Sequence, residues 1–361
     1  MSMQPSDEQE LSDAIAAANG PLRIIGGGTR GVVCDGERLS AAAISGISLY
    51  DPGALTIVTA AGTPLNEIET ALAAEGQRLP FEPMDHCGLL ATDGTPTIGG
   101  VVAANVSGPR RVQAGGCRDS LIGVRFVDGR GTVLKNGGRV MKNVTGYDLV
   151  KLMAGSYGTL GVISEVAFKV LPDVETSASV ILQGLSDERA VAAMARALGS
   201  PYEVSGAAHD GMRTLLRLEG FAESVAYRAK KLQSLLAEFG ETEVVQDTKQ
   251  IWRDLRDVTV LQGQSGDIWR ISVKPSDAPQ LVAGLGAISV LYDWGGGLIW
   301  ALMPEGVDLR AKMGNVQGHA TLLRGTGFTR FHPEAAPLAA ISAGLRTQFD
   351  PRGILNAGLM G

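Results

Sequence analysis

The stretch "RIIGGGTRG", residues 23–31, decides which class of fold the chain can adopt. Gly26, Gly28 and Gly31 match the pattern G-x-G-x-x-G after a short apolar strand. In a doubly wound dinucleotide fold a helix begins inside this loop, because the pyrophosphate rests on the helix N-terminus. The residues that follow, "VVCDGERL", contain a β-branched pair and Asp-Gly, which favour strand and turn. We therefore interpret the match as accidental, and no Gly-Lys-Ser/Thr follows to make a P-loop.

The same loop still suits an anion. Three consecutive glycines, Gly26 to Gly28, allow backbone N–H groups to converge into a concave nest. Thr29 adds a hydroxyl donor, and Arg30 adds positive charge. The alternative interpretation is a sharp turn between two strands, which glycine also favours. The loop taken alone leaves both interpretations open.

Composition excludes several classes of function. The chain has 361 residues, of which 45% are hydrophobic and 19% charged, and this is typical of a globular protein. Its formal net charge of −6 argues against nucleic acid as the main partner. No apolar run reaches the roughly 18 residues that cross a bilayer, and "MSMQPSDEQE" does not resemble a signal peptide. We expect a cytoplasmic protein with no membrane span; a peripheral position at the inner membrane, reached through a partner, stays open.

The three cysteines, Cys34, Cys87 and Cys117, do not form a C-x-x-C pair. A self-contained zinc or iron–sulfur site needs several such ligands at close spacing. We therefore expect three reduced thiols and no metal site in this chain.

Local signals predict the first elements. Ser6 with Gln9 resembles a capping box, so a helix is expected over about residues 7–18. Short strands are expected at 22–25 and 54–60, and a helix after them with Thr63 as its cap and Pro64 at its first position. From about 175 to 330 strands and helices alternate in a pattern that favours an antiparallel sheet with helices on one side.

Four further blocks accompany "GGGTR". They are "TIGGVVAANVSG" (97–108), "RDSLIGVRFVDGRGTVL" (118–134), "KNVTGYDLVKLMAGSYGTLGVISEVAFKVLP" (142–172) and "FDPRGILNAG" (349–358). In order and spacing the chain resembles the FAD-linked oxidases of the vanillyl-alcohol oxidase and p-cresol methylhydroxylase (PCMH) type. The resemblance implies an α+β fold: a two-subdomain PCMH-type FAD-binding domain over 1–174, and a short α+β cap domain with an antiparallel sheet over 175–333. A C-terminal helix and tail, 334–361, would then return to the FAD domain.

The resemblance also implies which residues hold FAD. The pyrophosphate would lie against Gly26, Gly27, Gly28, Thr29 and Arg30, and from the other side against Thr97, Ile98, Gly99 and Gly100, with Asn105 and Gly108 further along. The ribose and adenine end would meet Gly158, Gly161, Val162 and Ile163, and Asn356 would hydrogen-bond near the flavin. Some relatives attach FAD covalently through a histidine just after the first glycine pair. Gly28, Thr29 and Arg30 stand there in this chain, so we expect FAD to bind non-covalently.

Within this family the chain is most similar to the E-subunit branch of bacterial glycolate oxidases. The early start of the FAD domain, the short cap and the tail from "GHATLLRG" to "ILNAG" carry this resemblance. It implies oxidation of glycolate to glyoxylate, with electrons passed through the flavin to an iron–sulfur subunit beside a larger FAD-containing subunit. The alternatives are a stand-alone FAD enzyme for another small 2-hydroxy acid such as D-lactate, and a non-redox scaffold subunit.

One departure concerns catalysis. Related hydroxy-acid dehydrogenases carry a histidine-rich cap motif that helps to hold a metal, whereas this chain reads "LYDWGGGLIWALM" (291–303) at the similar place. Without an imidazole there, proton abstraction lacks an obvious base, so we expect this chain to relay electrons or to complete a complex. The catalytic residues are unknown. His319 and Arg324 are the candidates for contact with the flavin or a carboxylate, and His86 is expected to be a packing or surface residue.

Overall fold

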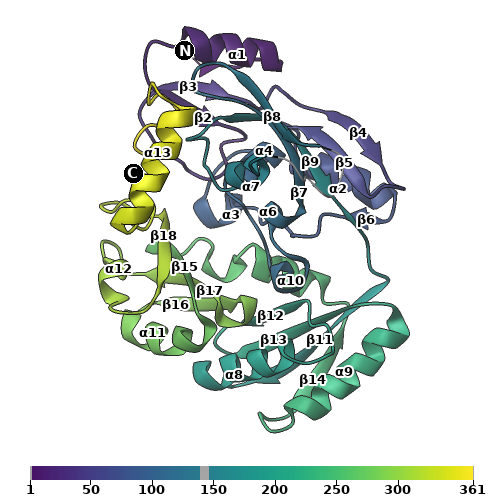
Figure 1. Ribbon diagram of the computed structural model, residues 1–361. Coiled ribbons are helices and arrows are strands. Elements are labelled where there is room, and N and C mark those ends of the chain that lie inside the picture. The colour runs from purple at the N-terminus through teal and green to yellow at the C-terminus, as the bar shows by residue number, and fades with distance from the viewer. Residues whose placement is uncertain (1, 139–145, 361) are drawn as a thin grey trace.

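The computed structural model describes residues 2–138 and 146–360, and its chain folds into two lobes (Figure 1). The first lobe contains strands β1 to β10 together with the C-terminal tail, and the second lobe contains strands β11 to β18. Both lobes combine helices with sheets, which confirms the predicted α+β class. Residues 142–145 of the block "KNVTGYDLVK" lie outside the described residues.

The first lobe is built on two main sheets. A parallel sheet has the order β1-β3-β2, an antiparallel sheet has the order β4-β5-β9-β7-β8, and β10 pairs with β6. The strands are β1 (Ser2–Met3), β2 (Leu22–Ile25), β3 (Glu37–Ser40), β4 (Ile47–Asp51), β5 (Thr56–Ala60), β6 (Gln77–Arg78), β7 (Leu121–Val127), β8 (Val133–Gly137), β9 (Val162–Lys169) and β10 (Leu171–Pro172). The helices are α1 (Glu8–Ala17), α2 (Leu65–Ala74), α3 (Cys87–Leu90), α4 (Ile98–Ala103), α5 (Arg111–Ala114), α6 (Cys117–Ser120), α7 (Leu149–Met153) and, from the tail, α13 (Ala336–Phe349).

The region after the glycine loop contains no helix. Strand β2 ends at Ile25, the chain passes Gly31 in turn and loop structure, and β3 begins at Glu37. The rejection of a doubly wound dinucleotide fold is therefore confirmed. The two predicted helices that flank this region form as α1 and α2, but both of their predicted caps are wrong.

Helix α1 is capped one residue later than expected. Asp7 is the N-cap, and its Oδ1 accepts from the Glu10 backbone N–H at 2.8 Å, while Ser6 bonds to the Glu10 carboxylate. In α2 the cap is Pro64, which offers no side-chain acceptor. The Thr63 hydroxyl instead donates to the Ala60 carbonyl at 2.7 Å, so it fixes the preceding turn rather than the helix.

The second lobe is one antiparallel sheet in the order β14-β11-β13-β12-β16-β17-β15-β18. Its strands are β11 (Thr176–Gln183), β12 (Gly206–His209), β13 (Arg213–Gly220), β14 (Thr242–Gln246), β15 (Asp267–Val273), β16 (Ser289–Asp293), β17 (Leu298–Met303) and β18 (Gly318–Arg324). Its helices are α8 (Asp187–Leu198), α9 (Ala222–Leu236), α10 (Lys249–Arg256), α11 (Ala278–Leu285) and α12 (Leu309–Lys312), with short 3₁₀ turns η1 (Thr259–Leu261), η2 (Pro275–Asp277) and η3 (Trp294–Gly296). Each half has the order strand–helix–strand–strand–helix–strand, so two ferredoxin-like units share one sheet through β12 and β16.

The two faces of this sheet have different partners. Trp269, Ile271 and their neighbours on one face pack into a core formed with the second lobe's own helices. Ile268, Leu298 and Trp300 on the other face belong to the same core as residues of the first lobe. Because side chains alternate along a strand, the second face is the one that covers the first lobe.

The C-terminal tail returns to the first lobe. Leu22 donates its N–H to the Ile354 carbonyl at 2.7 Å, and Asn356 donates to the Leu22 carbonyl at 2.9 Å, so the tail lies along β2. Ile354 and Leu355 are buried in a small core with α1. The end of helix α13 contacts the end of β7, since Phe349 accepts from the Gly129 N–H at 2.8 Å and its ring lies 6.0 Å from that of Phe126.

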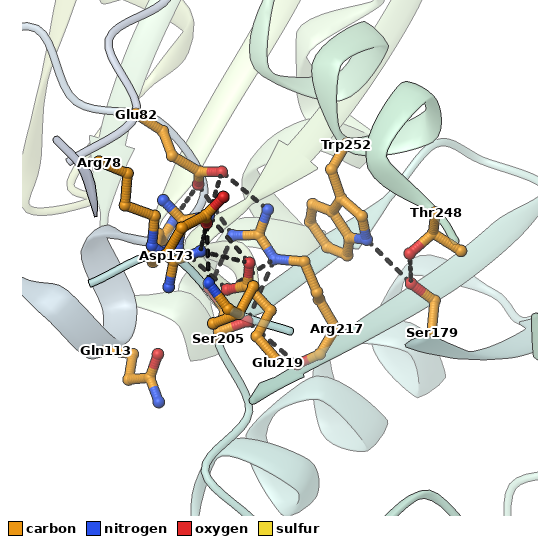
Figure 2. A network of polar contacts seen from close by, with 12 residues as sticks. Arg78, Glu82, Gln113, Asp173, Ser179, Ser205, Arg217, Glu219, Thr248 and Trp252 are labelled. Carbon is orange, nitrogen blue, oxygen red and sulfur yellow. Dashed lines mark hydrogen bonds and ion pairs between the residues drawn. The ribbon is translucent and has the colours of Figure 1, made fainter. Parts of the chain in front are cut away.

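A buried network of ion pairs joins the lobes (Figure 2). Arg217 of β13 donates to both oxygens of Glu82 in the first lobe, at 2.9 and 2.8 Å. Glu219, two residues along β13, accepts from Arg110 at 2.9 and 3.0 Å and from Arg78 at 3.0 Å. Arg110 also lies 3.0 Å from Glu82. Each lobe therefore contributes both a carboxylate and a guanidinium to one shared network.

Burial makes this network sensitive to the loss of either sign of charge. The side chains of Arg217, Arg110 and Glu219 are only 3%, 8% and 7% exposed. Burial alone would raise the pKa of Glu219, but the guanidinium groups of Arg217 and Arg110 hold that pKa well below its ordinary value. Burial also raises the pKa of Glu82, but Arg217 and Arg110 lower it by more, so the pKa of Glu82 lies below its ordinary value. A charge left here without its partner would be costly.

Replacing one carboxylate should weaken the contact between the lobes. Glu219→Gln is expected to lower the free energy of unfolding by about 3–5 kcal/mol, because it leaves Arg110 and Arg78 buried with less negative charge. Glu203→Gln is the matched control, since Glu203 meets Arg228 with a side chain that is 72% exposed, and it should cost less than about 1 kcal/mol. Urea unfolding at pH 7 measures both. Equal losses in the two variants would contradict the role assigned to the network.

Candidate functional site

A cavity of about 370 Å³ lies at the glycine loop of the first lobe. Its walls come from the loop after β2, the start of α4, the segment before β9 and the tail. It brings together most of the residues predicted to hold FAD: Gly26, Gly27, Gly28, Thr29, Arg30, Thr97, Gly99, Gly100, Gly158, Gly161, Val162, Ile163 and Asn356. Segments that are far apart in the sequence therefore meet around one space.

Two glycines of the loop are required by packing between loops. A Cβ at Gly26 would lie 2.4 Å from the Thr97 Oγ1, and one at Gly27 would lie 1.6 Å from the Thr95 carbonyl oxygen. Thr97 in turn caps α4, because its hydroxyl accepts from the Gly100 N–H at 3.4 Å. These glycines let the two loops touch, so the ligand is not the reason for the absence of a side chain at either position.

Gly28 differs from its neighbours. Its φ is +76°, in the region that favours glycine, and no heavy atom lies within 4 Å of a Cβ built on it. Gly28 is exposed and lines the cavity, so the space beside it is open. This glycine therefore keeps room for a ligand.

Arg30 supplies positive charge without a partner. Its Nε and Nη2 are buried and have no hydrogen-bond partner, and Arg23, also in the cavity wall, has an unpartnered buried Nε. Burial lowers the pKa of Arg30, and no carboxylate pairs with it among the described residues. Donors that are buried and unpaired are costly unless a ligand satisfies them, so the cavity is built for an anionic group.

Asn356 ties three walls of the cavity together. Its Oδ1 accepts from the Ile24 N–H at 2.7 Å and from the Cys34 thiol at 3.3 Å, while its Nδ2 donates to the Tyr157 carbonyl at 2.7 Å. The side chain was expected to bond near the flavin, and the structure shows its polar atoms bonded to the protein chain. It therefore acts on any ligand through the position of the walls.

Three predicted residues lie outside the cavity. Ile98 is fully buried in the core, and Asn105 accepts from the Arg118 N–H at 3.0 Å. Gly108 packs against another loop, since a Cβ there would lie 2.3 Å from the Glu82 carbonyl oxygen. Each of the three packs against neighbouring structure, and its contact with FAD stays a prediction.

The two catalytic candidates, His319 and Arg324, both lie on β18 but have different surroundings. Arg324 donates to the carbonyls of Gly266 and Leu89, each at 3.2 Å, and also to that of Gln264, so backbone oxygens occupy its donors. These bonds use three of its five N–H groups, and its contact with a carboxylate or the flavin stays a prediction. His319 is paired with Ser272 in the sheet, on the face that covers the first lobe, and is exposed. Partial desolvation of the ring by the atoms around it, together with the charge of Arg270, lowers the pKa of this otherwise exposed residue.

Two further groups lie at the boundary between the lobes: His86, which was expected to be a packing or surface residue, and Arg270, which sequence reasoning missed. His86 is only 7% exposed, and its Nδ1 is buried without a partner. Burial together with the charges of Arg30 and Arg270 lowers its pKa well below the ordinary value, so the imidazole is neutral at pH 7. Arg270 lies in the middle of β15 between apolar residues, and a lone arginine in such a strand was the signal that could have identified it.

The segment that replaces the histidine motif contains Asp293 and Trp294 at the end of β16. The Trp294 N–H donates to the Asp293 Oδ1 at 2.7 Å, and the Trp294 indole donates to the Gly108 carbonyl at 3.0 Å across the boundary. In the ranges 2–138 and 146–360 no three His, Cys, Asp or Glu side chains are placed to hold a metal ion. The residues at this place therefore do not fit the metal of the related dehydrogenases.

Comparison with known proteins agrees with these features. Residues 1–137 match the family model described as FAD binding domain. The chain is 39% identical over 358 residues to the glycolate oxidase subunit GlcE of Escherichia coli K12, covering 98% of this chain and 95% of that protein. The chain belongs to the GlcE family of FAD-linked oxidoreductases.

Other matches are partial or structural. The glycolate oxidase subunit GlcD of Bacillus subtilis is 30% identical over 150 residues, 42% of this chain and 32% of that protein. The D-lactate dehydrogenase of Archaeoglobus fulgidus is 27% identical over 185 residues, 48% of this chain and 39% of that protein. An alkyldihydroxyacetonephosphate synthase structure superposes with a TM-score of 0.72 at 15% identity, over 98% of this chain and 76% of that one, which shows a shared fold.

FAD fits the cavity of this GlcE-family chain. The cofactor carries a pyrophosphate, and the unpaired donors of Arg30 and Arg23 together with the open space at Gly28 suit such a group. FAD is the cofactor of the family, and the chain is an oxidoreductase subunit. Within the described residues, none of the helices has both the length and the apolar character needed to cross a membrane.

The role of Gly28 can be separated from simple backbone strain. Gly28→Ala is expected to weaken FAD binding by about tenfold or more, because the methyl group enters the cavity. Gly211→Ala is the matched control, because Gly211 also has a positive φ of +88° and open space around its Cβ, but it lies outside the cavity wall. Fluorescence titration of the apoprotein with FAD measures both. Equal weakening in the two variants would show that strain alone is responsible.

The buried carboxyl of Asp293 should make stability depend on pH. Burial raises its pKa from 3.8 to about 7, so the folded state holds a proton that the unfolded state releases between these values. Stability contributed by this group therefore falls as pH rises from about 4 to 7. Asp293→Asn should be increasingly more stable than the wild type between pH 5 and pH 8. A difference in unfolding free energy that does not change with pH would contradict this assignment.

Proposed function

We propose that this chain is the FAD-binding subunit of a glycolate oxidase complex that oxidises glycolate to glyoxylate. The observation that carries the proposal is the identity of 39% over nearly the whole length of both chains, since the relative is named as a glycolate oxidase subunit. Bound FAD supplies a two-electron acceptor for the C–H bond of the hydroxy acid. The chain's own residues then bind the cofactor, and they orient and shield the reacting groups.

In this proposal the glycine loops hold the cofactor. Gly28 leaves room for the pyrophosphate, and Arg30 neutralises its charge with the donors that otherwise have no partner. Backbone groups from Gly158 to Ile163 border the ribose and adenine end. Asn356 keeps these walls at a fixed separation. FAD attachment is non-covalent, since Gly28, Thr29 and Arg30 stand where some relatives have the attaching histidine.

The complex contains a larger FAD-containing subunit and an iron–sulfur subunit as partners. Support comes from the word subunit in the names of two relatives and from this chain's isolated cysteines, Cys34, Cys87 and Cys117. An iron–sulfur cluster needs about four closely placed thiolates, so a cluster that receives the electrons would belong to another chain. We place the complex in the cytoplasm, with peripheral contact at the inner membrane as the alternative.

We also propose that the hydroxy acid meets the flavin of this chain, in place of the purely electron-relaying role that the missing histidine motif favours. A neutral, buried imidazole, that of His86, lies at the lobe boundary, where burial and the charges of Arg30 and Arg270 keep a proton off the ring, so it can offer a nitrogen as a hydrogen-bond acceptor to the substrate hydroxyl. The group that orients the substrate hydroxyl is then supplied from the loop before α3. His319, exposed on the facing sheet, is the second imidazole near this place.

Flavin reduction tests the proposed function directly. The visible absorbance of the oxidised flavin should be lost when glycolate is added without oxygen to the FAD-loaded protein, because electrons pass from substrate to cofactor. D-lactate serves as the comparison acid, since one relative is a D-lactate dehydrogenase. Loss of flavin absorbance with D-lactate but not with glycolate would favour the alternative of a stand-alone FAD enzyme for another 2-hydroxy acid. A flavin that stays oxidised with glycolate, alone and with the partner subunits, would contradict the proposal.

A further inference from the structure

Arg270 occupies an unusual position in the sheet of the second lobe. It pairs with Trp300 of β17 and Thr321 of β18, so its side chain is on the same face as theirs. That face covers the first lobe, since Trp300 belongs to the core shared between the lobes. Its strand neighbours Trp269 and Ile271 face the opposite way, into the core formed with the helices. The sequence therefore directs one charged side chain of β15 toward the lobe boundary.

Two indole rings hold the Arg270 guanidinium. Its Cζ lies 5.2 Å from the ring centre of Trp294 and 5.9 Å from that of Trp300. Trp294 is itself fixed by bonds to Asp293 and Gly108. Cation–π contacts use the face of a guanidinium and leave its N–H edge available. Among the described residues, the side chain of Arg270 makes no hydrogen bond and no salt bridge, so this edge is available for a ligand.

The charges around Arg270 are mostly of the same sign. Arg111 stacks on Trp294 at 4.7 Å, and the side chain of Arg330 reaches the carbonyls of Arg30 and Gly31 from the second lobe. Asp293 is the acid that lies close to Arg270, and burial raises its pKa to about 7, so it is only partly ionised at neutral pH. A surplus of buried positive charge favours binding of a small anion.

We propose that Arg270 binds the carboxylate of the 2-hydroxy acid, with its N–H fork pointing from the Trp294–Trp300 pair toward the flavin lobe. This inference rests on the proposed function and adds the residue that selects a carboxylate. The guanidinium fork matches the two oxygens of a carboxylate, which gives orientation as well as charge. The charge that a metal supplies in related dehydrogenases is supplied here by arginine, in keeping with the lack of a donor cluster in the described part of the chain.

Oxalate is the probe, because it has the carboxylate of glycolate but no C–H bond to oxidise. Its binding to the FAD-loaded full-length protein is followed by the shift in flavin absorbance, with and without EDTA. Arg270→Gln is expected to raise the oxalate Kd by about 10- to 100-fold, and EDTA to leave it unchanged. Arg270→Lys, which keeps the charge and loses the fork, should raise it by about fivefold. FAD content and circular dichroism of each variant report its folding.

Arg189→Gln is the matched control, because Arg189 also stacks on an aromatic ring, 5.6 Å from the centre of Phe239, on the exposed side of the second lobe. It should bind oxalate like the wild type. Unchanged oxalate binding in both Arg270 variants, or binding that EDTA abolishes, would overturn the inference, while glycolate reduction of the wild-type flavin would leave the proposed function standing. If Arg270→Gln does not fold, Arg270→Lys decides the question. A wild-type flavin that responds to neither acid would overturn both.

Discussion

The crossed ion pairs between the lobes are the constraint on which the rest of the structure depends. Glu82 of the first lobe binds Arg217 of the second, and Glu219 of the second binds Arg110 of the first. Because each lobe carries both signs of charge, a rotation or a shift of one lobe would place like charges together. The network therefore fixes one relative position of the lobes. It lies away from the cavity, so it sets the geometry of the site without occupying it.

That fixed position brings two unlike surfaces together. The first lobe presents glycine loops, which are shaped by contacts such as Gly27 against Thr95 and leave Arg30 unpaired. The second lobe presents a sheet face on which apolar residues such as Trp300 surround Arg270, while Arg217 and Glu219 of the ion-pair network lie further along the same face. In the proposed site neither surface is sufficient alone, because the first lobe holds the cofactor and the second lobe provides Arg270. A site for a small acid arises only where the two meet, which explains why the stability of the lobe contact bears on function.

The sequence predicted the parts of this arrangement that are local. Local features depend on neighbouring residues and were predicted correctly. They include the strand at 22–25 and the stretch without a helix after Gly31. The caps at Ser6 and Thr63 were wrong because Asp7 and the Ala60 turn compete for the same backbone groups. The ion pairs could not be predicted, since Glu82 and Arg217 are 135 positions apart. Burial of His86 likewise depends on both lobes.

Arg324 and Arg270 show why residue type alone does not assign a role. Both are arginines on adjacent strands of one sheet, and pattern reasoning selected Arg324 because of its place near the tail. Arg324 ends on carbonyl oxygens, which use its N–H groups, whereas Arg270 ends between indoles, which use only its faces. The two arginines therefore differ in the groups that contact their guanidinium, not in residue type. Trp294, at the place where the resemblance led us to expect a histidine motif, contacts only the face of the Arg270 guanidinium, so the N–H edge stays available for the proposed carboxylate.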